Sequence, residues 1–140
     1  MSATTYNSPA PPNRLFVYGT LMQGEVRHHL LLAGGIQSIS PASIAGELLD
    51  FGEYPGLQLS TGTKGRVAGE LVEFESLDKI IAALDEEEGP DFRRELVNVT
   101  LPNGRGRFAW TYVLAAEAGR GGNAISSGNW RAKSARAQSA

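Results

Sequence analysis

The stretch RLFVYGTL, residues 14–21, joins a run of strand-forming side chains directly to a glycine and a threonine. Leu15 to Tyr18 favour a buried β-strand, and Gly19 tolerates unusual φ angles and lets another molecule approach the main chain closely. Backbone N–H groups that leave a strand at such a point can converge into an anion-binding nest, here with the hydroxyls of Tyr18 and Thr20 at its edge. A plain corner between a strand and a helix explains the same residues, so this stretch alone leaves both interpretations open.

The composition is that of an ordinary globular protein. The chain has 140 residues, of which 41% are hydrophobic, enough for one domain with its own core. Its 13 basic and 15 acidic side chains give a net charge of -2, so we expect no nucleic-acid partner. The absence of cysteine excludes disulfides and thiolate metal sites. Because no apolar run resembles a secretory signal or a membrane span, we expect a cytoplasmic protein with no membrane partner.

The chain divides into three parts. Residues 1–13 are rich in Ser, Thr and Pro, and we expect them to form a disordered leader. Residues 14–131 form the predicted folded domain, and the polar residues 132–140 form a flexible tail. Nothing in the sequence points to a particular oligomeric state.

Short strands dominate the predicted domain, and only two helices accompany them. Strands are expected at residues 14–18, 36–39, 43–50, 65–75, 92–101 and 106–114, with one more after a tight turn within residues 53–60. The first helix is expected within residues 24–35, with Val26, Leu30 and Ala33 on one side. Asn103-Gly104 is a strong hairpin signal between the last two strands. This pattern favours class α+β, a strongly bent sheet or small barrel with helices on its outside.

The second helix carries the clearest helical signal in the chain. Its apolar residues recur at helical spacing, at Leu77, Ile80, Ile81 and Leu84. Ser76 can cap its start, and Gly89-Pro90 ends it after Glu88. The last turn carries four consecutive acids, residues 85–88, although the partial negative charge of a helix C-terminus disfavours carboxylates there.

Two interpretations explain these acids. In one, they extend into water and pair with Arg93 and Arg94. In the other, one of them points inward and uses a raised pKa to carry protons near neutral pH. Glu88 is the best candidate, because it immediately precedes the Gly-Pro break. In that case Arg94 is its expected buried charge partner and Phe92 an apolar wall, since the two share one face of a strand.

The sequence offers no other recognisable site. It has no GxGxxG, P-loop or GxSxG motif. The adjacent His28 and His29 point about 100° apart on a helix and cannot hold one metal ion together, so one is expected at a helix–sheet seam and the other in solvent. We therefore expect neither a metal nor an organic cofactor.

Several motifs, in order along the chain, resemble the gamma-glutamylcyclotransferase-like superfamily (AIG2-like, with YtfP-type and BtrG-type proteins). The resemblance rests on FVYGTL at 16–21, YPGL at 54–57, VAGELVEF at 67–74, LDEEEG at 84–89, FRRELV at 92–97, WTYV at 110–113 and SGNW at 127–130. The first resembles the family's signature strand and turn, the second its Tyr-Pro loop, and the fourth the segment with its catalytic glutamate. The set covers most of residues 14–131.

The resemblance implies a small mixed β-barrel with peripheral helices and a pocket at the end of the first strand. Carried over by position, the substrate-binding residues would be Tyr18, Gly19, Thr20, Leu21, Tyr54, Phe92 and Arg94. The amides of the first four would hold the substrate's α-carboxylate, and Glu88 would be the catalytic acid and base. Phe92 stands where many members have Tyr, and Arg27 where many have Asn.

The implied activity is the cyclisation of a γ-glutamyl amine or peptide to 5-oxoproline, with release of the amine and no metal or organic cofactor. The implied partner is thus a small-molecule γ-glutamyl substrate. An alternative is a non-catalytic module on the same fold that binds a small molecule or a partner. A third is a lyase or transferase for a related acyl-amine, as in BtrG-type members, which act on a biosynthetic intermediate.

Overall fold

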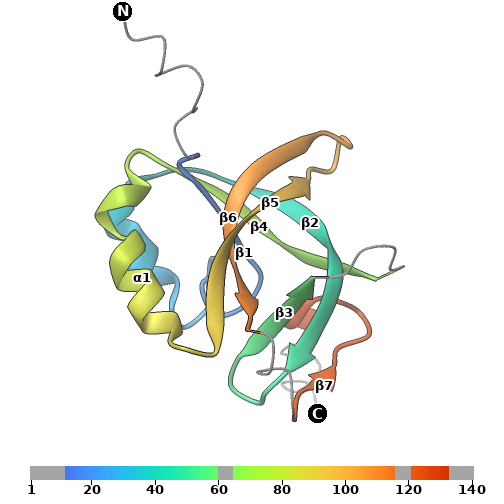
Figure 1. Ribbon diagram of the computed structural model, residues 1–140. Helices are drawn as coiled ribbons and strands as arrows, with labels where there is room; N and C mark the ends of the chain where they lie inside the picture. The colour runs from blue at the N-terminus through green and yellow to red at the C-terminus, as the bar shows by residue number, and fades with distance from the viewer. Residues whose placement is uncertain (1–11, 60–64, 116–120, 133–140) are drawn as a thin grey trace, which may run out of the picture.

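A computed structural model describes residues 12–59, 65–115 and 121–132 of the chain (Figure 1). Its elements, in chain order, are β1 (Arg14–Val17), η2 (His28–Gly34), β2 (Ile36–Asp50), β3 (Pro55–Leu59), β4 (Arg66–Phe74), η3 (Leu77–Lys79), α1 (Ile81–Glu88), β5 (Phe92–Thr100), β6 (Gly106–Leu114) and β7 (Asn123–Ala124). The expected leader falls largely, and the expected tail almost wholly, outside the described residues. No helix among the described residues is long and apolar enough to cross a membrane.

Five strands close into a mixed barrel. Neighbouring strands follow the order β2-β4-β1-β6-β5, and a single pairing of Ser43 with Thr100 joins β5 back to β2. β1 runs parallel to β6, with Leu15 beside Trp110, while the other pairs are antiparallel. The helix α1 lies on the outside of this barrel (Figure 1). The small mixed β-barrel with peripheral helices, expected from the sequence, is therefore confirmed.

β3 and β7 extend the sheet beyond the barrel. β3 pairs with β2 from Gly46 to Asp50, and β7 pairs with the last two residues of the same strand. β3 also packs near β6. This places the start of β3 beside the end of β1, where the site described below lies.

β1 is the central strand of the core. Leu15, Phe16 and Val17 are all at most 2% exposed, because β1 is flanked by β4 and β6 and covered on both faces. A strand buried on both faces reads as a continuous apolar run rather than an alternating one. This explains why LFVY carries no polar residue at alternate positions.

The first expected helix differs from the structure. A short 3-10 helix, η2, replaces it, and Leu31 and Gly34 face inward. Val26 is 74% exposed and lies before the helix, and Ala33 is also exposed, so the apolar side expected from these residues does not form. A 3-10 helix has three residues per turn, so residues three apart share its buried side.

The second expected helix is divided in two, as η3 and α1. Leu77, Ile80 and Leu84 are buried as expected, and α1 ends at Glu88. The Ser76 side chain makes no capping hydrogen bond within the described residues, so the expected cap is wrong. Its backbone amide instead donates to the carbonyl of Gly34, which ties the start of η3 to the end of η2.

Two boundaries also differ from the expectation. The strands expected at 36–39 and 43–50 form one strand, β2, because β4 pairs with it on both sides of Pro41. Asn13, expected in the leader, belongs to the folded body: its carbonyl accepts a hydrogen bond from Phe74 and its side chain accepts one from Leu77.

Candidate active site

A cavity of about 190 Å³ opens where β1 and α1 both end. It is lined by Phe16, Val17, Tyr18, Gly19, Thr20, Leu21, Arg27, Tyr54, Pro55, Glu87, Glu88, Asp91, Phe92 and Tyr112. Seven of the eight residues predicted for the site line this cavity, and Arg94 is the exception. The cavity therefore brings together the turn after β1, the end of α1 and the Tyr-Pro loop, three segments far apart in the sequence.

The turn after β1 has its carbonyls and its amides in different environments. The carbonyls of Gly19, Thr20 and Leu21 accept, in that order, from the amide of Met22 (3.0 Å), the amide of Arg27 (2.8 Å) and the imidazole Nδ1 of His28 (3.0 Å). Within the described part of the chain, the amides of the same three residues donate to no protein acceptor. A turn whose carbonyls are all bonded to protein and whose amides are not has the polarity of an anion-binding nest.

Gly19 is required by its contact with the Tyr-Pro loop. A Cβ atom at this position would lie 2.4 Å from Cγ and 2.7 Å from Cδ of Pro55. The ring of Pro55 thus packs directly against the main chain of the turn. This contact explains why the YGT and YPG motifs occur together: each shapes the same wall of the cavity.

Glu88 is the last residue of α1, and its side chain is only 13% exposed. The guanidinium of Arg27 lies 3.9 Å from the Glu88 carboxylate and 3.4 Å from that of Glu87. Burial raises the pKa of Glu88, the Arg27 charge lowers it and the Glu87 charge raises it, for a pKa of about 7. Glu88 can therefore accept or donate a proton near neutral pH.

Two buried tyrosine hydroxyls frame the cavity and are both bonded to protein. Tyr18 donates to the carbonyl of Tyr112 (2.7 Å) and accepts from the amide of Leu57 (3.2 Å). Tyr112 donates to Asp85 (2.7 Å). Burial, followed by the Glu88 charge, raises the pKa of Tyr18, and burial with the Asp85 hydrogen bond raises that of Tyr112. Both groups are neutral at physiological pH.

The expected ion pair between Glu88 and Arg94 is wrong. Arg94 donates two hydrogen bonds to Asp85, at 2.9 and 3.2 Å, and its guanidinium lies 4.5 Å from the ring centre of Trp110. Burial alone would raise the pKa of Asp85, but the bonds from Arg94 and Tyr112 outweigh it and lower that pKa. Each interpretation of the acidic turn therefore matches the position of a different residue: Asp85 pairs with Arg94, and Glu88 lines the cavity, while a proton-carrying role for Glu88 stays a prediction.

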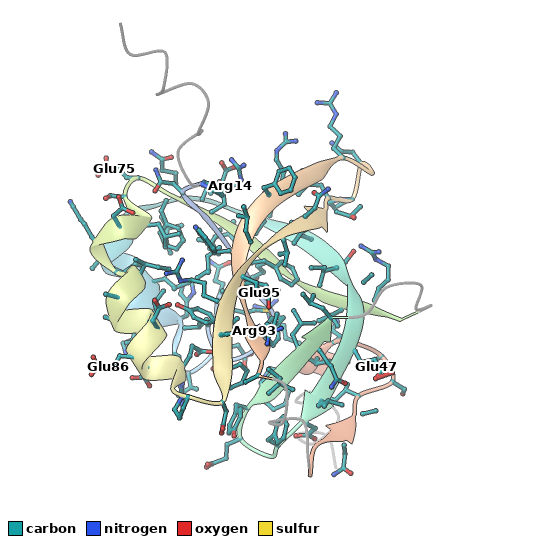
Figure 2. The ribbon with its side chains drawn as sticks, viewed as in Figure 1. Arg14, Glu47, Glu75, Glu86, Arg93 and Glu95 are labelled. Atoms are coloured by element: carbon teal, nitrogen blue, oxygen red, sulfur yellow. The ribbon has the colours of Figure 1, made fainter. Side chains whose placement is uncertain are left out.

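Glu86, Arg93 and Glu95 of this region do not line the cavity. Figure 2 shows Glu86 on the outer side of α1, pointing away from the barrel. It also shows Arg93 and Glu95 close together, and their side chains form an ion pair with each other. Because Arg93 alternates with Arg94 along β5, the two arginines take opposite faces, as the strand spacing predicted.

Aromatic rings form the apolar wall of the cavity. Tyr54 meets Phe92 edge to face, with ring centres 6.1 Å apart, and stacks on Phe51 at 5.5 Å. Both Tyr54 and Phe92 line the cavity. Of these two rings, only that of Tyr54 carries a hydroxyl group.

Sequence reasoning assigned no site role to four polar lining residues: Arg27, Glu87, Asp91 and Tyr112. Arg27 and Glu87 carried only weak signals, one as a departure from the family pattern and the other as part of the acidic turn.

The two adjacent histidines take different positions. The ring of His28 lies against the Leu21 carbonyl, while His29 is exposed. Among the described residues, no three His, Asp or Glu side chains are grouped as a metal ion requires.

Comparisons with known proteins agree with this geometry. The family model described as gamma-glutamyl cyclotransferase, AIG2-like, matches residues 15–132. The gamma-L-glutamyl-butirosin B gamma-glutamyl cyclotransferase of Niallia circulans is 42% identical over 108 residues, which cover 73% of this chain and 66% of the relative. The chain thus spans slightly less than two thirds of that relative's length.

Solved structures share the fold. YkqA from Bacillus subtilis is 27% identical, with a TM-score of 0.73 over 91% of this chain and 43% of YkqA. An AIG2-like protein from Mus musculus is 22% identical, with a TM-score of 0.67 over 84% of this chain and 88% of the mouse protein. With the family model matching almost the whole described domain, the chain belongs to the gamma-glutamyl cyclotransferase, AIG2-like family.

Proposed function

We propose that this protein is an enzyme that converts a γ-glutamyl amine or peptide into 5-oxoproline and a free amine. One observation carries the proposal: Glu88 and the Gly19–Leu21 turn line the same cavity. Family membership and the 42% identical relative support a cyclotransferase in general. The residue roles and the reaction below are our assignments.

The turn after β1 is assigned to the substrate's α-carboxylate. The amides of Gly19–Leu21 have no acceptor among the described residues, and a carboxylate bound there supplies one. Charge-assisted hydrogen bonds of this kind are about twice as strong as neutral ones. Fixing the carboxylate also fixes the adjacent α-carbon and therefore the position of the α-amino group.

The reaction needs no nucleophile from the protein. The α-nitrogen of the substrate attacks its own γ-carbonyl carbon, a new C–N bond closes a five-membered ring, and the bond to the leaving nitrogen breaks. Intramolecular attack of a well-oriented group lowers a barrier by about 7–11 kcal/mol in favourable cases. The enzyme's tasks are thus to fold the substrate and to move protons.

Glu88 is assigned to the proton transfers. In its ionised form it accepts a proton from the α-ammonium group, which makes that nitrogen a nucleophile. In its protonated form it returns that proton to the departing nitrogen. Ring closure releases a second proton from the α-nitrogen, which passes through Glu88 to the released amine, so the products are 5-oxoproline with one N–H and the amine as its ammonium ion. A pKa of about 7 suits both transfers at neutral pH. The neighbouring phenols are neutral and bonded to other groups, so neither is a competing base.

The proposal is tested by mass spectrometry of 5-oxoproline with a panel of γ-glutamyl amines. The panel includes γ-L-glutamyl-butirosin B, because the relative from Niallia circulans is named for it. We expect turnover of at least one member, and a loss of at least ~100-fold in Glu88→Gln. Glu86→Gln is the matched control, because Glu86 lies on the same helix and points away from the barrel (Figure 2). Full activity of Glu88→Gln on the true substrate would overturn the assignment.

A non-catalytic binding module is the second candidate function. Phe92 favours it, because this wall residue supplies no hydroxyl to steady a substrate. Titration calorimetry with γ-glutamyl amines and 5-oxoproline separates the two candidates. Binding without turnover of any bound compound supports the module, and turnover supports the enzyme.

A further inference from the structure

Arg27 contacts both halves of the proposed site through different parts of the residue. Its backbone amide donates a 2.8 Å hydrogen bond to the carbonyl of Thr20, in the turn after β1. Its guanidinium lies 3.4 Å from Glu87 and 3.9 Å from Glu88, at the end of α1. Its side chain is 35% exposed and lines the cavity. One residue therefore joins the turn to the acidic helix end.

We propose that Arg27 is a positioning residue, whose main chain fixes the Thr20 carbonyl in the turn and whose guanidinium favours the ionised form of the Glu88 carboxyl beside it. This inference rests on the proposed function, since it assigns Glu88 the role of a base. It assigns separate roles to the backbone and to the side chain of Arg27. The turn depends on the backbone of Arg27 and the charge of Glu88 on its side chain.

Besides Glu88, six charged or titratable residues line the cavity: Arg27, Glu87, Asp91, Tyr18, Tyr54 and Tyr112. Arg27 precedes η2, Glu87 belongs to α1 and Asp91 follows it, while the three tyrosines come from the end of β1, the loop before β3 and β6. Arg27 is the cation among the described residues that line the cavity, and the other five are acids or phenols. Burial raises the pKa of Glu88 most strongly, and only Arg27 opposes it. Without Arg27, Glu88 would therefore bind its proton more tightly.

Arg27 and Glu87 act on Glu88 with opposite signs. A neutral residue at position 27 removes the attraction that favours the carboxylate and leaves the repulsion from Glu87 unopposed. A neutral residue at position 87 removes that repulsion and leaves Glu88 as the remaining carboxylate within 4 Å of Arg27 among the described residues. The first change shifts the titration of Glu88 to higher pH and the second shifts it to lower pH. A merely structural role for Arg27 would produce no such pair of opposite shifts.

The role of the Arg27 backbone predicts that the turn after β1 is unchanged when only the side chain is replaced. Arg27→Gln keeps the backbone amide, so the bond to Thr20 and the turn remain. At a pH well above the shifted titration, kcat/KM of Arg27→Gln should return to within about threefold of the wild-type value. If the guanidinium instead bound the substrate, KM would rise at every pH.

The first experiment titrates Glu88 directly in protein labelled with 13C at the glutamate carboxyl carbons, with Glu88→Gln to assign the signal. We expect Arg27→Gln to raise the Glu88 titration midpoint by about one pH unit, the lower end of the effect of a nearby opposite charge. We expect Glu87→Gln to lower it. Arg105→Asn is the control, because this exposed hairpin residue lies outside the cavity lining. An unchanged midpoint in Arg27→Gln overturns the inference, whatever the activity.

The second experiment records kcat/KM against pH for the same variants on a panel member that the wild type turns over. The acidic limb should move to higher pH in Arg27→Gln and to lower pH in Glu87→Gln. A uniform loss with no displacement of this limb overturns the inference but leaves the proposed function standing. A shifted titration of Glu88 in a protein that turns over nothing supports the electrostatic role of Arg27 and contradicts the proposed function instead.

Discussion

The hydroxyl of Tyr18 donates a 2.7 Å hydrogen bond to the backbone carbonyl of Tyr112 and accepts one of 3.2 Å from the amide of Leu57. These bonds tie the end of β1 to β6 and to β3, beside the cavity. They therefore hold in place the residue that immediately precedes the turn. The tyrosine of the FVYGTL motif positions the turn through bonds to the protein, and its hydroxyl is not free for a substrate.

Tyr18→Phe should therefore lower stability more than activity. The change leaves the buried amide of Leu57 without this acceptor, which costs about 1–3 kcal/mol of unfolding free energy. We expect a lower urea midpoint, and kcat/KM within about fivefold of the wild type for the folded protein. A hundredfold loss of kcat/KM with unchanged stability would instead assign the hydroxyl to the substrate.

The raised pKa of Glu88 predicts a pH-dependent loss of stability. Its folded-state pKa of about 7 lies above the ordinary value of 4.5, so the folded protein binds this proton more tightly than the unfolded chain. The contribution of Glu88 to stability therefore falls as pH rises between these values, and the full penalty is present above pH 7. Glu88→Gln should be more stable than the wild type by about 1–3 kcal/mol at pH 8, with little difference at pH 4.5.

Urea denaturation of both proteins across this pH range measures the difference in unfolding free energy between Glu88→Gln and the wild type. The titration of the other acids contributes equally to both proteins and cancels in this difference. Glu86→Gln serves again as the control, and its difference from the wild type should stay small at both ends of the range. A stability difference between Glu88→Gln and the wild type that does not change with pH would contradict the burial of an ionisable carboxyl at this position.

The parts of the fold that sequence reasoning predicted are those with local causes. The Asn103-Gly104 turn, the end of α1 before Gly89 and the apolar run of β1 each depend on a few adjacent residues. The cavity, by contrast, is formed by segments that are far apart in the sequence, from the turn after β1 to Tyr112 in β6. Its prediction came from the order of motifs along the chain and their resemblance to a family.

The errors concern contacts that no local pattern specifies. Arg94 and Glu88 are both near Asp85, and only the three-dimensional arrangement shows that Arg94 pairs with Asp85 while Glu88 faces Arg27. Val26 fits a helical pattern but lies in a turn before a 3-10 helix. β2 continues through Pro41 because β4 pairs with it there, which is a long-range effect.

The position of Arg94 yields a further prediction. Its guanidinium holds Asp85 and covers Trp110 outside the cavity lining, so its loss should affect stability rather than substrate binding. Arg94→Met keeps part of the aliphatic stem and should lower the unfolding free energy by about 1 kcal/mol, with kcat/KM within about threefold of the wild type. Thermal denaturation and initial rates measure the two effects. A tenfold rise in KM at unchanged kcat would return Arg94 to the substrate-binding set.

The contact between Gly19 and Pro55 gives the sharpest test of the anion-binding turn. In Gly19→Ala the new methyl group would lie 2.4 Å from Cγ of Pro55, so the turn or the loop must move. Such overpacking costs about 1–3 kcal/mol, and a displacement of about 1 Å at a binding site can cost two orders of magnitude in rate. We expect the affinity for 5-oxoproline, measured by calorimetry, to fall at least about tenfold.

A double-mutant cycle separates this mechanism from a general loss of structure. Pro55→Ala removes Cγ and Cδ, the two atoms that the new methyl group would meet, so Gly19→Ala/Pro55→Ala should bind 5-oxoproline better than Gly19→Ala alone. Wild-type affinity in Gly19→Ala would show that the carboxylate binds elsewhere. If the double variant binds no better than Gly19→Ala, the collision with Pro55 is not the cause of the loss. Recovery in the double variant requires both that the turn binds the carboxylate and that Pro55 sets its position.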